Sequence, residues 1–342
     1  MSILLDAAKL ELQQRLHRIR VLPIVIVYLN NICDSQCITC SIWRNNEALK
    51  APAQRQMPDT VLEELYTTLE EWHPQQILIS GGEPALHPRF AEAVRRFGSI
   101  APQVCVITNG LLLGTLDRSE LHPVSEFYIS FDAPDAAAYR RIRGVDGFAR
   151  LAQSMKVLRE LPQRPRAVAR CTLQRQNVRH IPELIASARE LGFDNISFLA
   201  VDIGSSAFSR DIHGIPDMAA MQPTHEDLVE MERAILGLND PGSFVEGGTA
   251  RLSRILQYFR GLNRDSEFPA VRCNAPWVSI VVETTGAIRG CFFQPVIGDF
   301  RNINGPAALR FRRKLNVESD PTCRRCVCSK LLGVRDFLNM KT

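Results

Sequence analysis

The segment Asn31-Ile-Cys-Asp-Ser-Gln-Cys-Ile-Thr-Cys40 places three cysteines, Cys33, Cys37 and Cys40, in one short run with the spacing C-x3-C-x2-C. Three thiols so close in sequence cannot all pair as disulfides, but one loop can wrap them around a single metal cluster. Cysteine is the usual ligand of a 4Fe–4S cluster, which has four iron corners, so three protein ligands leave one iron open. An open iron can bind a substrate or cofactor, and the segment therefore predicts a reactive cluster.

The composition is that of a globular protein larger than one small domain. The 342 residues are 45% hydrophobic and 23% charged, and the net charge is +4. Short basic stretches such as 164–175 and 310–314 are more typical of solvated faces than of a nucleic-acid surface, so no nucleic-acid partner is expected. No apolar run is long enough to cross a bilayer, and no membrane partner is expected either.

The N-terminal residues 1–20 lack the apolar core and cleavage site of a signal peptide. They predict an amphipathic helix packed on the domain edge, with a membrane-surface role as the alternative. The apolar residues at helical spacing are Leu4, Leu5, Ala8, Leu10, Leu12, Leu16 and Ile19. Ten cysteines without an export signal indicate a reducing, cytoplasmic compartment, where clustered cysteines serve metal or redox chemistry. Cys105 and Cys171 stand alone in apolar strands and are expected to be small buried hydrophobic residues.

From residue 21 to about 203, β-rich runs alternate with amphipathic stretches. Strands are predicted at 21–28, 76–80, 104–108, 127–131, 167–173 and 196–201, and helices at 61–72, 88–97, 147–161 and 181–191. Nearly unbroken apolar strands separated by helices are typical of a parallel α/β sheet. Six such units without two symmetric halves predict a partial (β/α)6 barrel that resembles part of a TIM barrel, with ligands bound at the carboxyl ends of the strands.

The predicted organisation has four parts: residues 1–20, a partial barrel at 21–215, a helical linker at 216–265 with helices at 224–238 and 250–262, and a C-terminal domain at 266–342. The stretch 204–222 is rich in Gly, Ser, Asp and Pro, and it predicts a loop over the barrel mouth. In the C-terminal domain, 278–291 predicts a hairpin with a Thr-Gly turn.

The cysteine segment, placed directly after the first strand of an α/β chain, resembles the cluster motif of the radical S-adenosylmethionine (radical SAM) enzymes. A structural zinc site is the alternative and would need a fourth ligand. The segment Ser80-Gly-Gly-Glu-Pro84 follows the second strand, where the family receives the amino group of the cofactor's methionine. Glycines let the backbone approach a ligand, and a strand-end glutamate can meet an ammonium group. The resemblance thus implies S-adenosylmethionine bound at Gly81, Gly82 and Glu83.

Further segments resemble the family at later strand ends. Asn109 closes the third strand in a Thr-Asn-Gly sequence. Ser130, with Arg143 downstream, resembles the Ser and Arg that hold the cofactor's ribose and carboxylate. Arginine suits a carboxylate because its guanidinium forms a bidentate fork, but Arg140 and Arg141 compete for this assignment.

Gln174 and Asn177 end the fifth strand, and Leu199 or Ala200 ends the sixth near the expected adenine. Taken alone, each polar residue fits a turn or a cap as well as it fits a contact with the cofactor. The chain departs from the family at Thr39, because the residue before the third cysteine is often aromatic and lies beside the adenine. Adenine packing is therefore expected from elsewhere in the chain.

The two candidates for that packing are Ile38 and Trp43. The departure at Thr39 leaves the three cysteine ligands unchanged, so it does not affect cluster binding.

The C-terminal cysteines follow the pattern C-x12-G-x4-C, a gap, then C-x2-C, formed by Cys273, Cys291, Cys323 and Cys326. This pattern is similar to the twitch domain of the SPASM/twitch subgroup, a short form with one auxiliary cluster. The resemblance implies a second 4Fe–4S cluster on these four cysteines. Cys328 departs from the pattern: it is spare, it replaces Cys326, or it is what remains of a longer motif. A zinc site on the same cysteines is the alternative.

The resemblance also implies the chemistry. S-Adenosylmethionine chelates the open iron, and one electron from a flavodoxin- or ferredoxin-type protein cleaves it to methionine and a 5′-deoxyadenosyl radical. That radical removes hydrogen from an unreactive C–H bond. A fully ligated second cluster would carry electrons, which favours an oxidoreductase that oxidises its substrate by two electrons with the help of a base. No catalytic residue is identified, and the candidate bases are Asp202, His213, Glu246 and Glu283.

The substrate is predicted from what precedes the barrel. Only about 20 residues lie before the first strand, too few for the leader-peptide-binding domain that peptide-modifying members often carry. We therefore expect a small polar molecule such as a sugar, cyclitol or natural-product intermediate. The alternatives are a ribosomally made peptide recognised through a separate protein, and a redox-neutral epimerase, mutase or decarboxylase. A non-catalytic iron–sulfur sensor is the alternative from outside the enzymes.

Overall fold

One curved sheet of nine strands organises the computed structural model, which describes residues 2–214, 217–238 and 244–340. The strand order is β6-β5-β4-β3-β2-β1-β7-β8-β9, and the first six strands are parallel and lie in sequence order. These strands are β1 (Ile24–Asn30), β2 (Gln76–Gly81), β3 (Gln103–Thr108), β4 (Glu126–Ser130), β5 (Arg166–Leu173) and β6 (Asn195–Ala200). The predicted parallel α/β sheet of six strand–helix units is confirmed.

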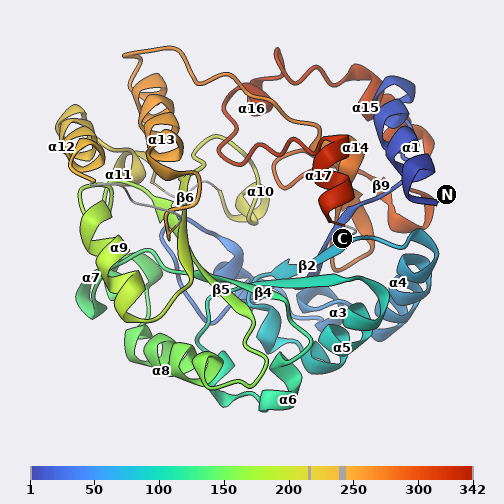
Figure 1. The fold of residues 1–342 in the computed structure, drawn as a ribbon, viewed down its shortest axis with the longest axis horizontal. Helices are drawn as coiled ribbons and strands as arrows, with labels where there is room; N and C mark the ends of the chain where they lie inside the picture. Colours follow the sequence, from blue (N-terminus) through green and yellow to red (C-terminus); the bar gives the residue numbers. More distant parts are fainter. Residues whose placement is uncertain (1, 215–216, 239–243, 341–342) are drawn as a thin grey trace.

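Helices follow the outer face of this sheet in an arc (Figure 1). They are α4 (Asp59–Trp72), α5 (Phe90–Ile100), α6 (Arg118–Leu121), α7 (Ala136–Arg143), α8 (Phe148–Arg159) and α9 (Ile181–Glu190). In β1 the side chains of Val25, Val27 and Leu29 belong to the buried core under these helices, whereas Ile24 and Ile26 face the inside of the curve. This alternation follows the two-residue period of a strand, and it leaves an inner face free for a site.

The C-terminal strands extend the same sheet and do not form a separate one. β7 (Ser279–Val282) pairs in parallel with β1, and β8 (Ala287–Arg289) and β9 (Val296–Asp299) continue antiparallel. The predicted Thr-Gly turn between β7 and β8 is present, with Gly286 at φ 89°, a left-handed conformation that glycine adopts without strain. The C-terminal region predicted as a domain therefore shares its sheet with the barrel.

The segment predicted as a helical linker contains α12 (His225–Leu236) and α13 (Gly248–Leu262). Their apolar faces are part of the main hydrophobic core. Between them, Val245 forms a parallel bridge with Ile196 of β6, so this region closes the far edge of the sheet. Covering an edge strand protects its unpaired backbone groups, which gives the two helices a structural role in the barrel itself.

The remaining α-helices are shorter or lie outside the strand–helix units of the sheet. They are α1 (Ser2–Leu16), α2 (Asn45–Ala48), α3 (Pro52–Arg55), α10 (Arg210–His213), α11 (Met218–Met221), α14 (Ala275–Val278), α15 (Pro306–Lys314), α16 (Pro321–Arg324) and α17 (Val334–Asn339). The predicted loop at 204–222 thus contains the short helices α10 and α11, while residues 215–216 lie outside the described part. Among the described helices, none has the length and apolarity that crossing a bilayer requires.

The N-terminal helix α1 is present, but only part of the apolar set predicted for residues 1–20 is buried. The exposed leucines are Leu5, Leu12 and Leu16. Leu10 is buried together with the fully buried Gln13. The Gln13 amide donates to the carbonyl oxygen of Trp277 (2.6 Å), and its Oε1 accepts from the backbone N–H groups of Arg20 and Val21 (3.1 Å each). Satisfying these buried backbone groups orients the helix, which apolar spacing alone cannot reveal.

Replacing Gln13 with Ala should lower the free energy of unfolding by about 2 kcal/mol or more, because two N–H groups and one carbonyl lose a buried partner. The matched control is Gln14→Ala at the exposed neighbouring position, which should change stability by less than about 0.5 kcal/mol. Urea denaturation followed by circular dichroism measures both variants. Equal losses in the two would contradict the anchoring role of Gln13.

Candidate active site

The cysteine loop follows β1 at the carboxyl edge of the sheet, and the end of α7 holds its backbone. The N–H of Gln36 donates to the carbonyl of Arg143 (2.9 Å), and the N–H of Ile38 donates to that of Ile142 (3.1 Å). Gly144 ends α7 at φ 71°, and a Cβ there would lie 2.4 Å from the carbonyl oxygen of Gln36. The glycine therefore permits both the helix end and the close approach of the loop.

Gly81 and Gly82 bring the end of β2 against the same loop. The N–H of Gly82 donates to Asn30 O (3.0 Å), and the N–H of Glu83 donates to Ile32 O (2.8 Å). A Cβ would lie 2.3 Å from Asn30 O at Gly81 and 1.9 Å from Ile32 O at Gly82. The glycines were predicted to let the backbone approach a ligand, and the approach that the structure shows is to the cysteine loop.

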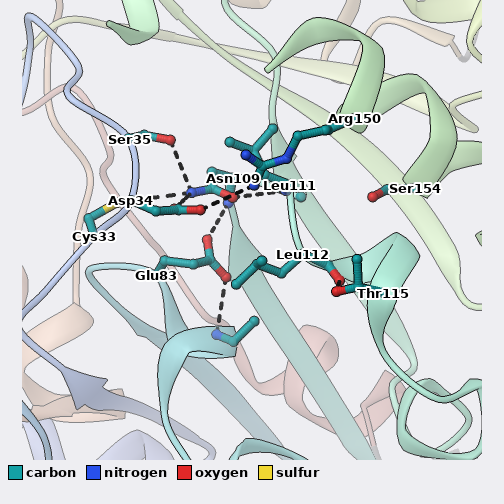
Figure 2. A network of polar contacts seen from close by, with 12 residues as sticks. Cys33, Asp34, Ser35, Glu83, Asn109, Leu111, Leu112, Thr115, Arg150 and Ser154 are labelled. Atoms are coloured by element: carbon teal, nitrogen blue, oxygen red, sulfur yellow. Dashed lines mark hydrogen bonds and ion pairs between the residues drawn. The ribbon is translucent and has the colours of Figure 1, made fainter. Parts of the chain in front are cut away.

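The buried carboxylate of Glu83 joins the ends of β2 and β3 (Figure 2). Its Oε1 accepts from Thr108 Oγ1 (2.7 Å) and the N–H of Ala85 (3.1 Å), and its Oε2 accepts from the N–H of Asn109 (2.7 Å). Burial raises the pKa of Glu83 to about 7, although these hydrogen bonds oppose the shift. The contacts give Glu83 a positioning role, and its contact with an ammonium group stays a prediction.

The side chain of Asn109 links β3 to the cysteine loop, as Figure 2 shows. Its Nδ2 donates to Asp34 Oδ1 (2.5 Å) and Ser35 Oγ (3.0 Å), and it lies 4.0 Å from Cys33 Sγ. Arg150 lies 3.5 Å from the other oxygen of Asp34. Asn109 was predicted to contact the cofactor, but its amide donors are directed at the loop that carries the first cysteine.

Arg143 is buried beside the loop, whereas its competitors Arg140 and Arg141 are exposed. Its Nη1 donates to Asp132 Oδ2 (2.9 Å). Burial raises the pKa of Cys37 to about 12, and the Arg143 charge opposes that rise. A cation beside a buried thiol favours the thiolate form that metal ligation needs. Within the described residues Arg143 Nε has no hydrogen-bond partner, so one donor is available to a further acceptor.

Gln174, just past the end of β5, is fully buried, yet neither its Oε1 nor its Nε2 has a partner among the described residues. An unpaired buried amide costs about 1–3 kcal/mol, so its retention calls for an explanation. Asn177 differs, because its amide donates to Asp132 O (2.9 Å) and Thr172 O (3.0 Å) and thereby holds the turn. Of the two predicted residues at this strand end, Gln174 is the one with free hydrogen-bonding groups.

Ser130 and Leu199 lie on the inner face of the sheet. Ser130 follows Tyr128 by two residues in β4, and Leu199 follows Ser197 by two residues in β6. Tyr128 lines the interior cavity, and Ser197 accepts a hydrogen bond from the side chain of Arg170 (2.8 Å). Because strand residues alternate with a period of two, all four side chains share that inner face.

The five cysteines of the second group line one cavity inside the curve of the sheet; they are Cys273, Cys291, Cys323, Cys326 and Cys328. Ile26, Leu78 and Tyr128 line it from the strands. Within the described residues, no set of three or more His, Cys, Asp or Glu side chains is arranged around a single metal ion. The five thiols nevertheless line one common space, as the predicted second metal centre requires.

Three of these thiols receive hydrogen bonds. Arg170 Nη2 donates to Cys328 Sγ (3.9 Å), Gln294 Nε2 donates to Cys323 Sγ (3.4 Å), and the N–H of Cys328 donates to Cys326 Sγ (3.4 Å). Both Cys326 and Cys328 therefore remain candidates for the fourth ligand.

The four candidate bases are all engaged by other side chains. Their partners are Arg210 for Asp202 (2.8 Å), Asn45 for His213 (2.6 Å), Asn195 for Glu246 (3.2 Å) and Arg289 for Glu283. Of the four, Glu246 is the one that lines the interior cavity. A base that acts on a substrate must reach it, so geometry favours Glu246.

Sequence reasoning missed Asn46, whose amide forms a reciprocal pair with the backbone of the first cysteine. Its Nδ2 donates to Cys33 O (2.7 Å), and its Oδ1 accepts from Cys33 N–H (3.1 Å). A single exposed asparagine in a short helix carries no signal of this kind, because the contact depends on the path of the chain between the two residues.

Known proteins resemble this chain in sequence. Residues 27–188 match the Radical SAM superfamily model. The PqqA peptide cyclase of Gluconobacter oxydans is 28% identical over 219 residues, which are 62% of this chain and 56% of that protein. The GTP 3′,8-cyclase of Chlorobaculum tepidum is 28% identical over 178 residues, 50% of this chain and 51% of that protein. The chain thus spans about half the length of the curated relatives that it matches.

Solved structures resemble the fold over nearly all of the chain. SuiB of Streptococcus suis bound to S-adenosylmethionine has a TM-score of 0.58 at 14% identity and covers 95% of this chain and 76% of its own. The native anSMEcpe with bound AdoMet has a TM-score of 0.59 at 14% identity and covers 87% of this chain and 84% of its own. Residues 27–188 thus match the radical SAM superfamily, as the cysteine segment predicted, and the fold of the chain resembles that of SuiB and anSMEcpe.

Replacing Gly82 with Ala should displace the cysteine loop, because the added Cβ would lie 1.9 Å from Ile32 O. We expect the variant to lose half or more of the iron that the wild type binds after anaerobic reconstitution. The matched control is Gly204→Ala, since nothing lies within 4 Å of a Cβ at that position. A colorimetric iron assay compares the two. Full iron content in the Gly82 variant would show that the close approach is not needed.

Proposed function

We propose that the protein cleaves S-adenosylmethionine at a 4Fe–4S cluster held by Cys33, Cys37 and Cys40, and oxidises a substrate bound inside the barrel. When bound, the cluster and cofactor supply a 5′-deoxyadenosyl radical that takes one hydrogen atom from the substrate. The observation that carries the proposal is the fixing of the cysteine loop by the ends of β2, β3 and α7. A loop held from three sides presents three thiols in one orientation, as a cluster with one open iron requires.

The chain offers unpaired polar groups where the cofactor would lie. Within the described residues, Asn30 Oδ1, Arg143 Nε and both amide atoms of Gln174 are buried without partners at this edge of the sheet. S-Adenosylmethionine carries an ammonium group, a carboxylate, ribose hydroxyls and an adenine, which supply matching donors and acceptors. The other residues that we assign to its site, by contact or by positioning, are Gly81, Gly82, Glu83, Asn109, Ser130 and Leu199.

We assign the second cysteine group to an auxiliary 4Fe–4S cluster, supported by the five thiols around one cavity. A cluster with four cysteine ligands has no open iron, so its role is to accept an electron. If the substrate radical left by hydrogen removal lost a proton to a base beside the cavity, where Glu246 lies, the thiols there would hold the group that takes up its unpaired electron and completes a two-electron oxidation. A flavodoxin- or ferredoxin-type protein in a reducing cytoplasm supplies the electron that cleavage of the cofactor consumes.

For the substrate we propose a small polar molecule. The interior cavity is lined by apolar strand residues with a few polar groups among them, including Gln76, Arg170 and Glu246, which is the usual pattern of a small-molecule site. Similarity to GTP 3′,8-cyclases, whose name gives a small polar substrate, supports this choice. The second candidate is a peptide, supported by the likeness to a PqqA peptide cyclase and to SuiB bound to its precursor peptide SuiA.

Replacing Cys33, Cys37 and Cys40 together with Ala should abolish formation of 5′-deoxyadenosine from S-adenosylmethionine under reducing conditions. We expect the rate of product formation to fall by about a hundredfold or more, because the variant would lack the cluster that supplies the electron. The matched control is Cys105→Ala, because Cys105 is buried in β3 and no part of either group. Liquid chromatography with mass spectrometry measures the product. A triple variant that still forms 5′-deoxyadenosine would refute the proposed function.

Replacing Gln174 with Leu should have opposite effects on stability and on cofactor affinity. Removing an unpaired buried amide should raise the melting temperature of the cofactor-free protein, because Leu needs no hydrogen bonds. Loss of the amide should weaken S-adenosylmethionine binding about tenfold, or about 1.4 kcal/mol. Calorimetry measures both quantities, and Gln163→Leu at an exposed position is the control. Unchanged affinity for S-adenosylmethionine in a stabilised variant would show that Gln174 does not contact the cofactor.

A further inference from the structure

The segment that follows β6, residues 201–214, lies across the chain that leaves the cysteine loop; we call it the β6 strap. The N–H of Ser41 donates to Phe208 O (3.2 Å), and the hydroxyl of Ser41 donates to Gly214 O (3.3 Å). Asn45 Nδ2 donates to Ser209 Oγ (3.0 Å). These contacts join two segments more than 160 residues apart in sequence, directly beyond the third cysteine.

A buried ion pair anchors the β6 strap to the cysteine loop. The side chain of Arg210 is 1% exposed, and its Nη1 donates to Asp202 Oδ2 (2.8 Å). Its Nη2 donates to Thr39 O (2.9 Å), the carbonyl immediately before Cys40. The hydroxyl and N–H of Ser205 bond the same Asp202 carboxylate, so that side chain is held from several sides. The guanidinium therefore has one fixed position beside the loop.

The backbone of the strap is strained where it meets the loop. Phe208 and Ser209 have φ of 61° and 60°, which is costly for residues other than glycine and rare for a bulky one. The Phe208 ring lies 5.5 Å from the Arg210 guanidinium and 6.3 Å from the Phe293 ring. Such strain persists only where surrounding contacts over-determine the conformation, and it is concentrated at functional sites.

A second buried pair lies beside the same loop. Arg143 and Asp132 have side chains that are 10% and 4% exposed and lie 2.9 Å apart, and the carbonyl of Arg143 accepts from Gln36 N–H. Two Arg–Asp pairs thus contact the cysteine loop, one through the Arg143 carbonyl at Gln36 and one through the Arg210 guanidinium at Thr39.

We propose that Asp202 and Arg210 are positioning residues that hold the Cys40 end of the loop and adjust the reduction potential of the cluster bound there. Reduction adds negative charge to a cluster, and net charge and solvent exposure around it set the potential. A buried cation at Thr39 O favours the reduced cluster, and the paired carboxylate moderates that effect. This inference rests on the proposed function, because it requires the cluster on these cysteines.

The test is a redox titration followed by electron paramagnetic resonance on Arg210→Gln and Asp202→Asn, with the signal that responds to S-adenosylmethionine as the readout. Loss of the cation should shift the midpoint potential to more negative values, and loss of the carboxylate should shift it to more positive values. The auxiliary cluster in the same molecule should keep its potential. The matched control is Arg179→Gln, which breaks a partly exposed Arg–Asp pair on the surface, with Asp227.

The outcomes distinguish a failure of this inference from a failure of the proposed function on which it rests. Opposite shifts support it, and a structural role alone would instead shift both variants alike or neither. If Arg210→Gln binds no iron at the loop, Arg210→Lys should restore the cluster, and Asp202→Asn must still shift the potential upward. Unchanged potentials in variants that retain the cluster overturn the inference alone. Absence of any signal that responds to S-adenosylmethionine in the wild type would instead overturn the proposed function.

Discussion

The carboxyl edge of the sheet depends on one buried carboxylate, that of Glu83. Burying a carboxylate is unfavourable unless its oxygens are hydrogen-bonded, and three donors from the end of β2 and the end of β3 meet this requirement. The same turn after β3 directs the amide of Asn109 at Asp34 and Ser35. The position of the first cysteine therefore follows from how Glu83 joins two neighbouring strands, and the glycines before it make the close approach possible.

Charge is the second constraint at this edge. The loop concentrates three thiols, Asp34 and the buried Glu83, and like charges close together are unfavourable where water is scarce. At an effective dielectric constant near 20, a pair of unit charges 4 Å apart interacts by about 4 kcal/mol, so a fixed cation matters. Arg143 and Arg210 supply cations beside the loop, and each is held by its own aspartate. The cations at this edge therefore suit the negatively charged cluster that we propose there.

Local patterns predicted much of the fold and the cysteine loop, because strand periodicity, cysteine spacing and the Gly-Gly-Glu segment are all short-range signals. Long-range geometry could not be predicted in the same way. The pairing of β7 with β1 and the burial of Gln13 depend on how distant segments dock. The stretch 204–222 was predicted only as a loop over the barrel mouth, since nothing in its composition shows that Arg210 reaches Thr39. Glu83 and Asn109 were predicted at the site, but their contacts with the loop were not.

We propose two distinct clusters in one chain, of which the one at Cys33, Cys37 and Cys40 alone would have an open iron. Electron paramagnetic resonance of the reduced, reconstituted protein, recorded with and without S-adenosylmethionine, tests this most directly. We predict two reduced-cluster signals, of which one changes when S-adenosylmethionine is added and the other does not. A single signal, or two signals that are both insensitive to S-adenosylmethionine, would contradict the account.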